Sequence, residues 1–162
     1  MIILDMSIMI DRPVGEVFDF MSAPENNFQW QYGTLATARL SEGVSSIGTF
    51  FRSIGHSMGQ RNLSTFEVTE YEPNRKYAFK SLSGPFRLQT AYTFEMADNS
   101  RTKINISIQA GVVDFVQMDE GILEKKMRKQ LQENLAVLRK LLEARQILPA
   151  PGINKFINTT GN

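Results

Sequence analysis

The chain has 162 residues, of which 42% are hydrophobic and 22% charged, a composition typical of one folded domain and not of a disordered or membrane-embedded protein. Eighteen lysines and arginines against 17 acidic residues give a formal net charge of +1, so no overall field attracts nucleic acid or an anionic membrane. The absence of cysteine excludes disulfides, thiolate metal sites and a cysteine nucleophile, and the single histidine limits metal chemistry further.

The N-terminus shows no targeting signal. Met1 to Asp5 contain no basic region ahead of an apolar core, and no uninterrupted apolar stretch approaches the roughly 20 residues that span a bilayer. We therefore expect a cytoplasmic protein without integral membrane association.

The first expected element is a strand over residues 2–10, which is rich in isoleucine and methionine and ends at Asp11-Arg12-Pro13. A helix follows, which Asp11 can cap ahead of Pro13. Its apolar residues are three and four positions apart and share one inward face; they are Val14, Val17, Phe18 and Met21. A second short helix is expected from about Ser22 to Gly33.

From Thr34 to about Val113 the apolar pattern changes to a period of two, and turn signals arrive at short intervals. This pattern predicts a meander of antiparallel strands, and with the first strand it gives a sheet of about seven. One face of the sheet is predicted to be apolar and the other to be polar and exposed to water. The predicted inward residues are Asn62, Ser64, Phe66 and Val68, then Tyr77 and Phe79, then Phe86, Leu88, Thr90, Tyr92 and Phe94, and finally Ile104, Ile106, Ile108 and Ala110.

The last expected element is one long amphipathic helix, about Gln117 to Arg145. An apolar sheet face needs a cover, and this helix supplies it. Its leucine-rich stripe consists of Leu123, Met127, Leu131, Leu135, Leu138, Leu141 and Leu142. The predicted fold class is therefore α+β: a curved antiparallel sheet around a long C-terminal helix, with two short helices between the first and second strands.

Several short strings sharpen this prediction. They are Arg12-Pro13-Val14 with Val17-Phe18, Pro24-Glu25-Asn26 with Trp30, Gly48-Thr49 with Phe51-Arg52, and Phe66-Glu67-Val68 through Glu72-Pro73 to Arg75. Together they resemble the polyketide cyclase/dehydrase-like group of the START and birch-pollen-allergen superfamily (SRPBCC), over roughly residues 3 to 145. The resemblance implies the helix-grip fold with an internal cavity, which relatives use for lipids, sterols, polyketides or plant hormones. We expect residues 1–146 to form a single domain and 147–162 a C-terminal tail.

Polar residues on the inward faces are the best candidates for a site, because burying a hydroxyl or amide without a partner costs about 1 to 3 kcal/mol. They either hydrogen-bond a ligand or ordered water in the cavity, or they bond to one another or to the backbone. These polar residues are Asn62, Ser64, Tyr77, Thr90, Tyr92 and Asn134. The apolar residues expected to line the cavity with them are Phe51, Phe66, Phe79, Ile106 and Met127.

Aromatic residues are expected near the mouth of the implied cavity. Trp30, with Phe28 and Tyr32, lies where the short helices meet the sheet in the resembling fold. The ring of Trp30 forms either a gate for the ligand or a plug that completes the core.

Catalytic and cofactor chemistry finds little support. His56 lies between glycines in a predicted hairpin tip, where a solvated loop histidine is the simpler interpretation. Asp119, Glu120 and Glu124 suit the positive end of the helix dipole better than they suit a carboxylate site. No phosphate-binding loop, metal-ligand spacing or nucleophile elbow is found, so we assign no catalytic residue, metal or cofactor.

The leading hypothesis is therefore a domain that binds a small hydrophobic molecule, lipid-, polyketide- or aromatic-like, between sheet and C-terminal helix. One alternative is a polyketide cyclase- or dehydratase-like enzyme, in which Tyr77, Tyr92, Asn134 or Ser64 orients a carbonyl compound. Another is a non-catalytic protein-interaction module. A homodimer is also compatible with the sequence.

Overall fold

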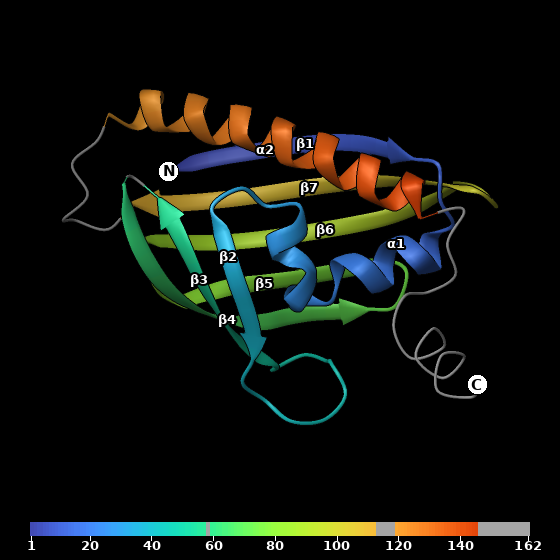
Figure 1. Ribbon diagram of the computed structural model, residues 1–162, viewed down its shortest axis with the longest axis horizontal. Helices are drawn as coiled ribbons and strands as arrows, with labels where there is room; N and C mark the ends of the chain where they lie inside the picture. The colour runs from blue at the N-terminus through green and yellow to red at the C-terminus, as the bar shows by residue number, and fades with distance from the viewer. Residues whose placement is uncertain (58, 113–118, 146–162) are drawn as a thin grey trace, which may run out of the picture.

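Seven antiparallel strands form one curved sheet in the residues that the computed structural model describes, 1–57, 59–112 and 119–145 (Figure 1). The strand order is β1-β7-β6-β5-β4-β3-β2, so six strands form a meander and the last of them returns beside β1. The strands are β1 Ile2–Ile10, β2 Thr34–Arg39, β3 Phe50–Ser57, β4 Gln60–Glu72, β5 Lys76–Ser83, β6 Phe86–Asp98 and β7 Arg101–Val112. This arrangement confirms the predicted fold class.

The alternation of inward and outward side chains follows the predicted register. Tyr92 on β6 pairs with Tyr77 on β5 and with Ile106 on β7, and all three side chains are buried on the inner face. Side chains alternate along each strand except at a bulge, such as the one between Val68 and Glu70 of β4, after which Tyr71 packs against the core. The inward side chains of β1 are also buried: Ile2, Leu4, Ile8 and Ile10.

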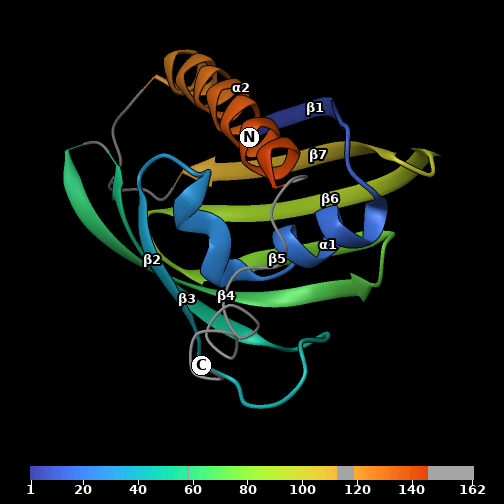
Figure 2. The same cartoon turned by 45° about the vertical axis from the view of Figure 1, so that its right-hand side comes forward.

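The long helix α2, Glu120–Ala144, lies along β1 on the inner face of the sheet (Figures 1 and 2). Asp119 caps it by accepting a hydrogen bond from the backbone N–H of Ile122 at 3.0 Å, which agrees with a structural role for the acidic residues there. Residues 117 and 118 of the predicted helix lie outside the described residues. The buried part of its predicted stripe is Leu123, Leu131, Leu135, Leu138 and Leu142.

Two short helical segments cover another part of the sheet. Helix α1, Val14–Met21, packs against β6 and β7, and the 3-10 helix η1, Pro24–Gln29, packs against β2. Pro13 is the N-cap of α1, with no side-chain hydrogen bond, so the predicted cap by Asp11 is wrong. Asp11 lies two residues before this N-cap, in the bend that follows β1, and its backbone N–H donates to Glu143 Oε2 of α2 at 2.9 Å.

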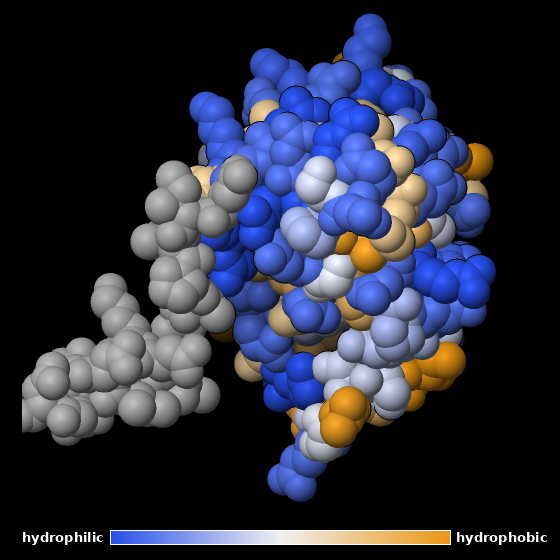
Figure 3. Space-filling view, turned by 90° about the vertical axis from the view of Figure 1, so that its right-hand side faces the viewer, coloured by the Kyte–Doolittle hydropathy of each residue, from blue (hydrophilic) through white to orange (hydrophobic). Residues whose placement is uncertain are grey.

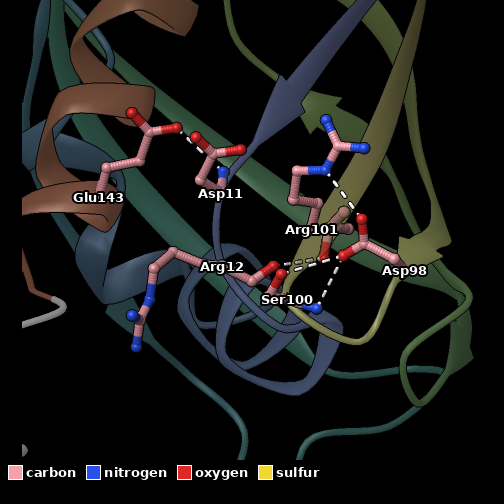
Figure 4. A network of polar contacts seen from close by, with 7 residues as sticks. Asp11, Arg12, Asp98, Ser100, Arg101 and Glu143 are labelled. Atoms are coloured by element: carbon pink, nitrogen blue, oxygen red, sulfur yellow. Dashed lines mark hydrogen bonds and ion pairs between the residues drawn. The ribbon is translucent and has the colours of Figure 1, made fainter.

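Polar contacts tie the ends of β1, α2 and the β6–β7 turn together (Figure 4). Thr102 Oγ1 donates to the carbonyl of Arg12 at 2.8 Å, and Asp98 Oδ1 accepts from the backbone N–H of Ser100 at 2.9 Å. Figure 3 shows this end of the molecule, where hydrophilic side chains predominate and hydrophobic ones gather in small groups. This end is thus held by a long-range hydrogen bond from the buried Thr102 and by local bonds within the turn, beneath a mostly hydrophilic surface.

Candidate functional site

A pocket of about 230 Å³ lies on the inner face of β3 and β4, next to the connection between η1 and β2. Its inner wall is aromatic. Phe51 and Phe66, which are opposite each other on β3 and β4, stack with ring centroids 5.1 Å apart, and Phe79 meets both rings edge-on at 5.6 and 5.7 Å. These offset and edge-on contacts make a rigid apolar surface.

Toward the β3–β4 hairpin the inner face becomes smaller and more polar. Ser53 pairs with Ser64, and Gly55 pairs with Asn62, in the two inward rows that follow Phe51 and Phe66. Small side chains leave unfilled volume beside the aromatic wall, and their polar atoms line it. Because side chains alternate along β3 and β4, the aromatic rings that form the wall of the pocket and the small polar side chains that leave its volume lie on the same face of the sheet.

Two glycines hold the mouth of the pocket against the sheet. Gly33 has φ +88°, and a Cβ there would lie 2.8 Å from the carbonyl oxygen of His56. A Cβ on Gly55 would lie 2.6 Å from the carbonyl oxygen of Gly33, which accepts a hydrogen bond from His56 N–H at 2.6 Å. This close backbone approach sets Gln31 and Tyr32, which line the pocket, above β3.

The β5–β6 turn closes the opposite side. Gly84 has φ +125°, and the position of its missing Cβ is taken by the hydroxyl of Ser64. The residues that follow it, Pro85, Phe86 and Leu88, line the pocket. A side chain at position 84 would displace Ser64, so glycine is required for both the turn and the contact.

Behind the aromatic wall lies a layer of Tyr77, Tyr92 and Trp30, all at most 3% exposed. Phe79 contacts both tyrosine rings, at 5.7 and 5.8 Å, and Tyr92 contacts Trp30 at 6.3 Å. Gln31 Nε2, at the edge of the pocket, donates to Tyr92 Oη at 3.4 Å. One layer of side chains thus separates the pocket from three buried polar aromatic residues.

Both buried tyrosines are held in the neutral form. Burial raises the pKa of Tyr77 above its ordinary value of 10.0, and the neighbouring Tyr92 and Glu25 raise it further. Burial also raises the pKa of Tyr92, and the hydrogen bond from Gln31 offsets this only in part. Both hydroxyls therefore stay protonated further into the alkaline range than an exposed tyrosine does.

Residues 1–143 match the model of the family described as polyketide cyclase / dehydrase and lipid transport. The chain belongs to this family. Comparison with curated protein sequences gives no match.

Solved structures share the fold of this polyketide cyclase/dehydrase and lipid transport family member. The Zhui aromatase/cyclase from Streptomyces sp. R1128 superposes with a TM-score of 0.71 at 14% identity, over 93% of this chain and 98% of that one. A START superfamily protein from Mycobacterium smegmatis gives 0.68 at 16% identity, over 90% and 97%. A protein from Thermus thermophilus gives 0.68 at 20% identity, over 88% and 95%.

The structure brings most of the predicted site residues of this family member to one region. Phe51, Asn62, Ser64, Phe66 and Phe79 line the pocket. Trp30, Tyr77 and Tyr92 lie directly behind it. Thr90 is buried opposite Phe79, and Ile106 is buried opposite Tyr92, so these two lie on the same inner face without lining the pocket.

The two predicted residues of α2 lie elsewhere. Asn134 Oδ1 accepts hydrogen bonds from the backbone N–H of Tyr32 at 3.0 Å and from Gln130 Nε2 at 2.9 Å. Neither Asn134 nor the half-buried Met127 lines the pocket. The amide of Asn134 therefore ties α2 to the connection between η1 and β2.

Sequence reasoning missed Asn27, Gln31 and Ser53, which also line the pocket. Extending the period of two from Phe51 would have found Ser53. Gln31 and Asn27 had no such signal, because the backbone approach of Gly33 to Gly55 decides their position and periodicity does not show it.

His56 is exposed and lies in β3, so the predicted loop position is wrong. Gly55 is a strand residue packed under Gly33, and the turn comes only after Ser57. Among the described residues, no cluster of His, Asp and Glu could hold a metal ion. In the same residues, no helix is both long and apolar enough to cross a membrane.

Proposed function

We propose that this protein binds a small, largely apolar molecule in the pocket between β3, β4 and the η1–β2 connection. The observation that supports this function best is the aromatic wall of Phe51, Phe66 and Phe79 beside unfilled space, with small polar side chains around it. Rigid apolar walls with a few placed polar groups are typical of ligand sites. The family description, which names lipid transport and polyketide chemistry, agrees with such a ligand.

The size of the pocket limits the ligand. Its volume of about 230 Å³ is below the roughly 300 to 1,000 Å³ of most small-molecule sites. An apolar ligand that buries about 200 Å² gains roughly 5 kcal/mol before ordering costs are subtracted. We therefore expect a compact ligand with micromolar or weaker affinity unless polar contacts add to it.

Filling the pocket tests the proposal. Ser53→Leu places a larger side chain beside the aromatic wall, and Thr65→Leu makes a similar change on the outer face of the neighbouring strand. We expect Ser53→Leu to weaken binding of the neutral fluorescent dye N-phenyl-1-naphthylamine at least tenfold, and Thr65→Leu to leave it unchanged. Fluorescence titration measures both, after thermal unfolding has shown that each variant folds. Equal dye affinity of the two variants would contradict the proposed site.

A cyclase- or dehydratase-like enzyme is the second candidate. The family description, which names cyclase and dehydrase chemistry, favours it, and the hydroxyl of Tyr92, which Gln31 of the pocket contacts at 3.4 Å, is the candidate donor to a carbonyl oxygen. Mass spectrometry of an identified ligand before and after incubation distinguishes conversion from binding alone.

Other expectations from the sequence stay predictions. They are the protein-interaction module, the homodimer, the lack of nucleic-acid binding, the cytoplasmic location and the division into a domain of residues 1–146 and a tail of 147–162. Residues 146–162 lie outside the described residues.

A further inference from the structure

The loop between β2 and β3 presents apolar side chains to water. At its tip, Val44 is 91% exposed and Ile47 is 65% exposed. At its base, Leu40 and Phe50 are also exposed, and they lie opposite each other because Leu40 N–H donates to the carbonyl of Phe50 at 2.8 Å. The next residue, Phe51, is buried on the inner face, so Phe50 points to the outer face of the sheet. Four exposed apolar side chains thus belong to one loop and its base.

Hydrogen bonds hold this loop in place. Gly48 N–H donates to the carbonyl of Val68 at 2.8 Å, and Val68 N–H donates to the carbonyl of Thr49 at 2.9 Å. These two bonds attach the loop to β4. Thr49 is buried, and its Oγ1 accepts from Ser46 N–H at 3.1 Å. The backbone is thus fixed against the sheet while the apolar side chains at the tip stay in water.

The loop extends beyond the body of the molecule, at the lower edge of Figures 1 and 2. A stable interface with a folded partner or a second copy needs about 800 Å² and roughly 20 to 30 residues on each side. The apolar group is much smaller than this, because the next outward residue on β3 is the exposed Arg52. A lipid bilayer needs no such area, since single apolar side chains insert at the boundary between headgroups and acyl chains.

The charges beside the apolar group have both signs. Arg52 follows Phe50 on the outer face, and Glu42 lies in the loop; both are exposed, and within the described part of the chain neither has an ion pair. Glu67, opposite Phe50, is paired with Lys80 at 3.8 Å. The guanidinium of Arg52 suits the phosphate of a phosphatidylcholine headgroup, and the carboxylate of Glu42 suits its trimethylammonium group. The loop therefore complements a zwitterionic headgroup and offers no net charge to an anionic partner.

We propose that the β2–β3 loop binds lipid bilayers, with Val44 and Ile47 inserted among the acyl chains and with Leu40 and Phe50 at the headgroup boundary. Binding comes from apolar insertion and not from charge, which agrees with the net charge of +1. It also agrees with the family description, which names lipid transport. The inference goes beyond the proposed pocket function and does not depend on a ligand in the pocket.

Vesicle binding of a loop variant tests the proposal. Cosedimentation with sucrose-loaded phosphatidylcholine vesicles gives the lipid concentration at which half of the protein is bound. The double variant Val44→Asn, Ile47→Asn removes both apolar tips without adding charge, and this concentration should increase at least tenfold. Ile122→Asn makes the same change at an exposed position of α2, and it should leave binding unchanged. Because all three side chains are exposed, each variant is expected to keep the thermal unfolding temperature of the wild type.

Fluorescence tests whether the tip of the loop enters the bilayer. Val44→Trp adds an indole at the tip, whereas the natural Trp30 is buried and should report no change. The emission of the added indole should shift to shorter wavelength when phosphatidylcholine vesicles are added, and phosphatidylcholine brominated on the acyl chain should quench it. Ile122→Trp should show neither effect. An added indole at position 44 that stays in water would overturn insertion.

The composition of the vesicles separates insertion from charge. An equimolar mixture of phosphatidylcholine and phosphatidylglycerol should bind the protein within about twofold of phosphatidylcholine alone, at low and at high salt, because salt screens only charge. Binding that appears only with phosphatidylglycerol and is lost at high salt would overturn the apolar mode.

The remaining outcomes concern the loop as a whole. No binding of the wild type to phosphatidylcholine, or equal binding of the wild type and the double variant, would overturn the inference. So would a dimer in analytical ultracentrifugation that the double variant converts to a monomer, because the loop would then join two copies. Ser53→Leu, which fills the pocket, should keep its vesicle binding, so a failure of the pocket proposal and a failure of this one are distinguishable.

Discussion

At the scale of single residues, the carboxylate of Asp98 makes the stability of the β6–β7 turn depend on pH. Its carboxylate accepts from the backbone N–H of Ser100 at 2.9 Å, from Arg101 Nε at 2.9 Å and from Ser100 Oγ at 3.0 Å (Figure 4). The backbone bond from Ser100, followed by the contacts of Arg101 and the Ser100 hydroxyl, lowers the pKa of Asp98 from 3.8 to about 2. The ionised form therefore stabilises the β6–β7 turn.

Replacing Asp98 by Asn tests this effect. A carboxylate whose pKa falls on folding adds stability above its unfolded pKa of 3.8, and this stability is lost as the pH falls toward about 2. Asp98→Asn should thus lower the unfolding temperature at pH 7, and the gap to wild type should close between pH 4 and 2. Thermal unfolding across pH 2 to 7 measures it, with the exposed Asp19→Asn as control. A gap that stays constant with pH would refute the argument.

Residues of the candidate site differ in how far the sequence predicts them. The period of two predicts that Phe66, Ser64 and Asn62 share the inner face, because the pleat fixes alternation. It does not predict which inward side chains border empty space. That depends on the size of neighbours on other strands, such as Phe79, and on turns that bring Gln31 above the sheet.

At the scale of elements, the amide of Asn134 links α2 to the mouth of the pocket. Its Oδ1 accepts from Tyr32 N–H, in the connection that positions Gln31. The sequence leaves two interpretations of Asn134 open, a ligand contact or a bond to the backbone. The structure shows the bond to the backbone, and it gives Asn134 a positioning role for the mouth.

Asn134→Ala should release this link. The lost hydrogen bond costs about 1 kcal/mol, which the higher helix propensity of alanine offsets in part. The sharper readout is hydrogen exchange of the Tyr32 amide, which should become at least several-fold faster. Gln132→Ala, at an exposed position of the same helix, should leave that exchange unchanged. Unchanged exchange in Asn134→Ala would show that the link does not hold the connection.

The elements themselves are largely predictable. The strand Ile2–Ile10 and the stripe of α2 follow from the sequence because their apolar periods are long and uninterrupted. The start of α1 is less predictable, because Asp11 and Pro13 both suit the start of a helix, and in the structure the N-cap is Pro13. An apolar period identifies the buried face of a helix and not the residue at which the helix begins.

At the scale of the whole molecule, the inner face of the sheet has two halves. Beneath α2 and α1 it carries Ile104 and Leu4, which are fully buried together with Val17 of α1. Beneath η1 and β2 it carries aromatic and polar residues, including Tyr77 and Tyr92. The first half supplies apolar burial for folding. The second contains the pocket, whose aromatic wall belongs to the same hydrophobic core, so binding and stability share these residues.

The two buried tyrosines predict how the whole fold responds to alkali. Burial raises the pKa of Tyr77 and Tyr92 in the folded protein, whereas in the unfolded chain both ionise near 10. A group whose pKa rises on folding contributes stability below its unfolded pKa and loses that stability as the pH increases. Above pH 10 the unfolded state is therefore favoured by about 1.4 kcal/mol per pH unit for each tyrosine that stays neutral when folded.

The two tyrosines contribute part of the slope of unfolding free energy against pH. Tyr92→Phe should halve this contribution, and the double variant with Tyr77→Phe should abolish it. Other groups titrate in the same range, but they are common to all variants, so the difference in slope isolates the buried pair. Tyr32→Phe is the control, because its side chain is 82% exposed and the change removes a hydroxyl from water. Urea unfolding from pH 9 to 12 gives the slopes, and absorbance at 295 nm follows tyrosine ionisation directly. A slope that Tyr92→Phe leaves unchanged would mean that its hydroxyl ionises in the folded protein, and the interior layer behind the pocket would then have to be open to water.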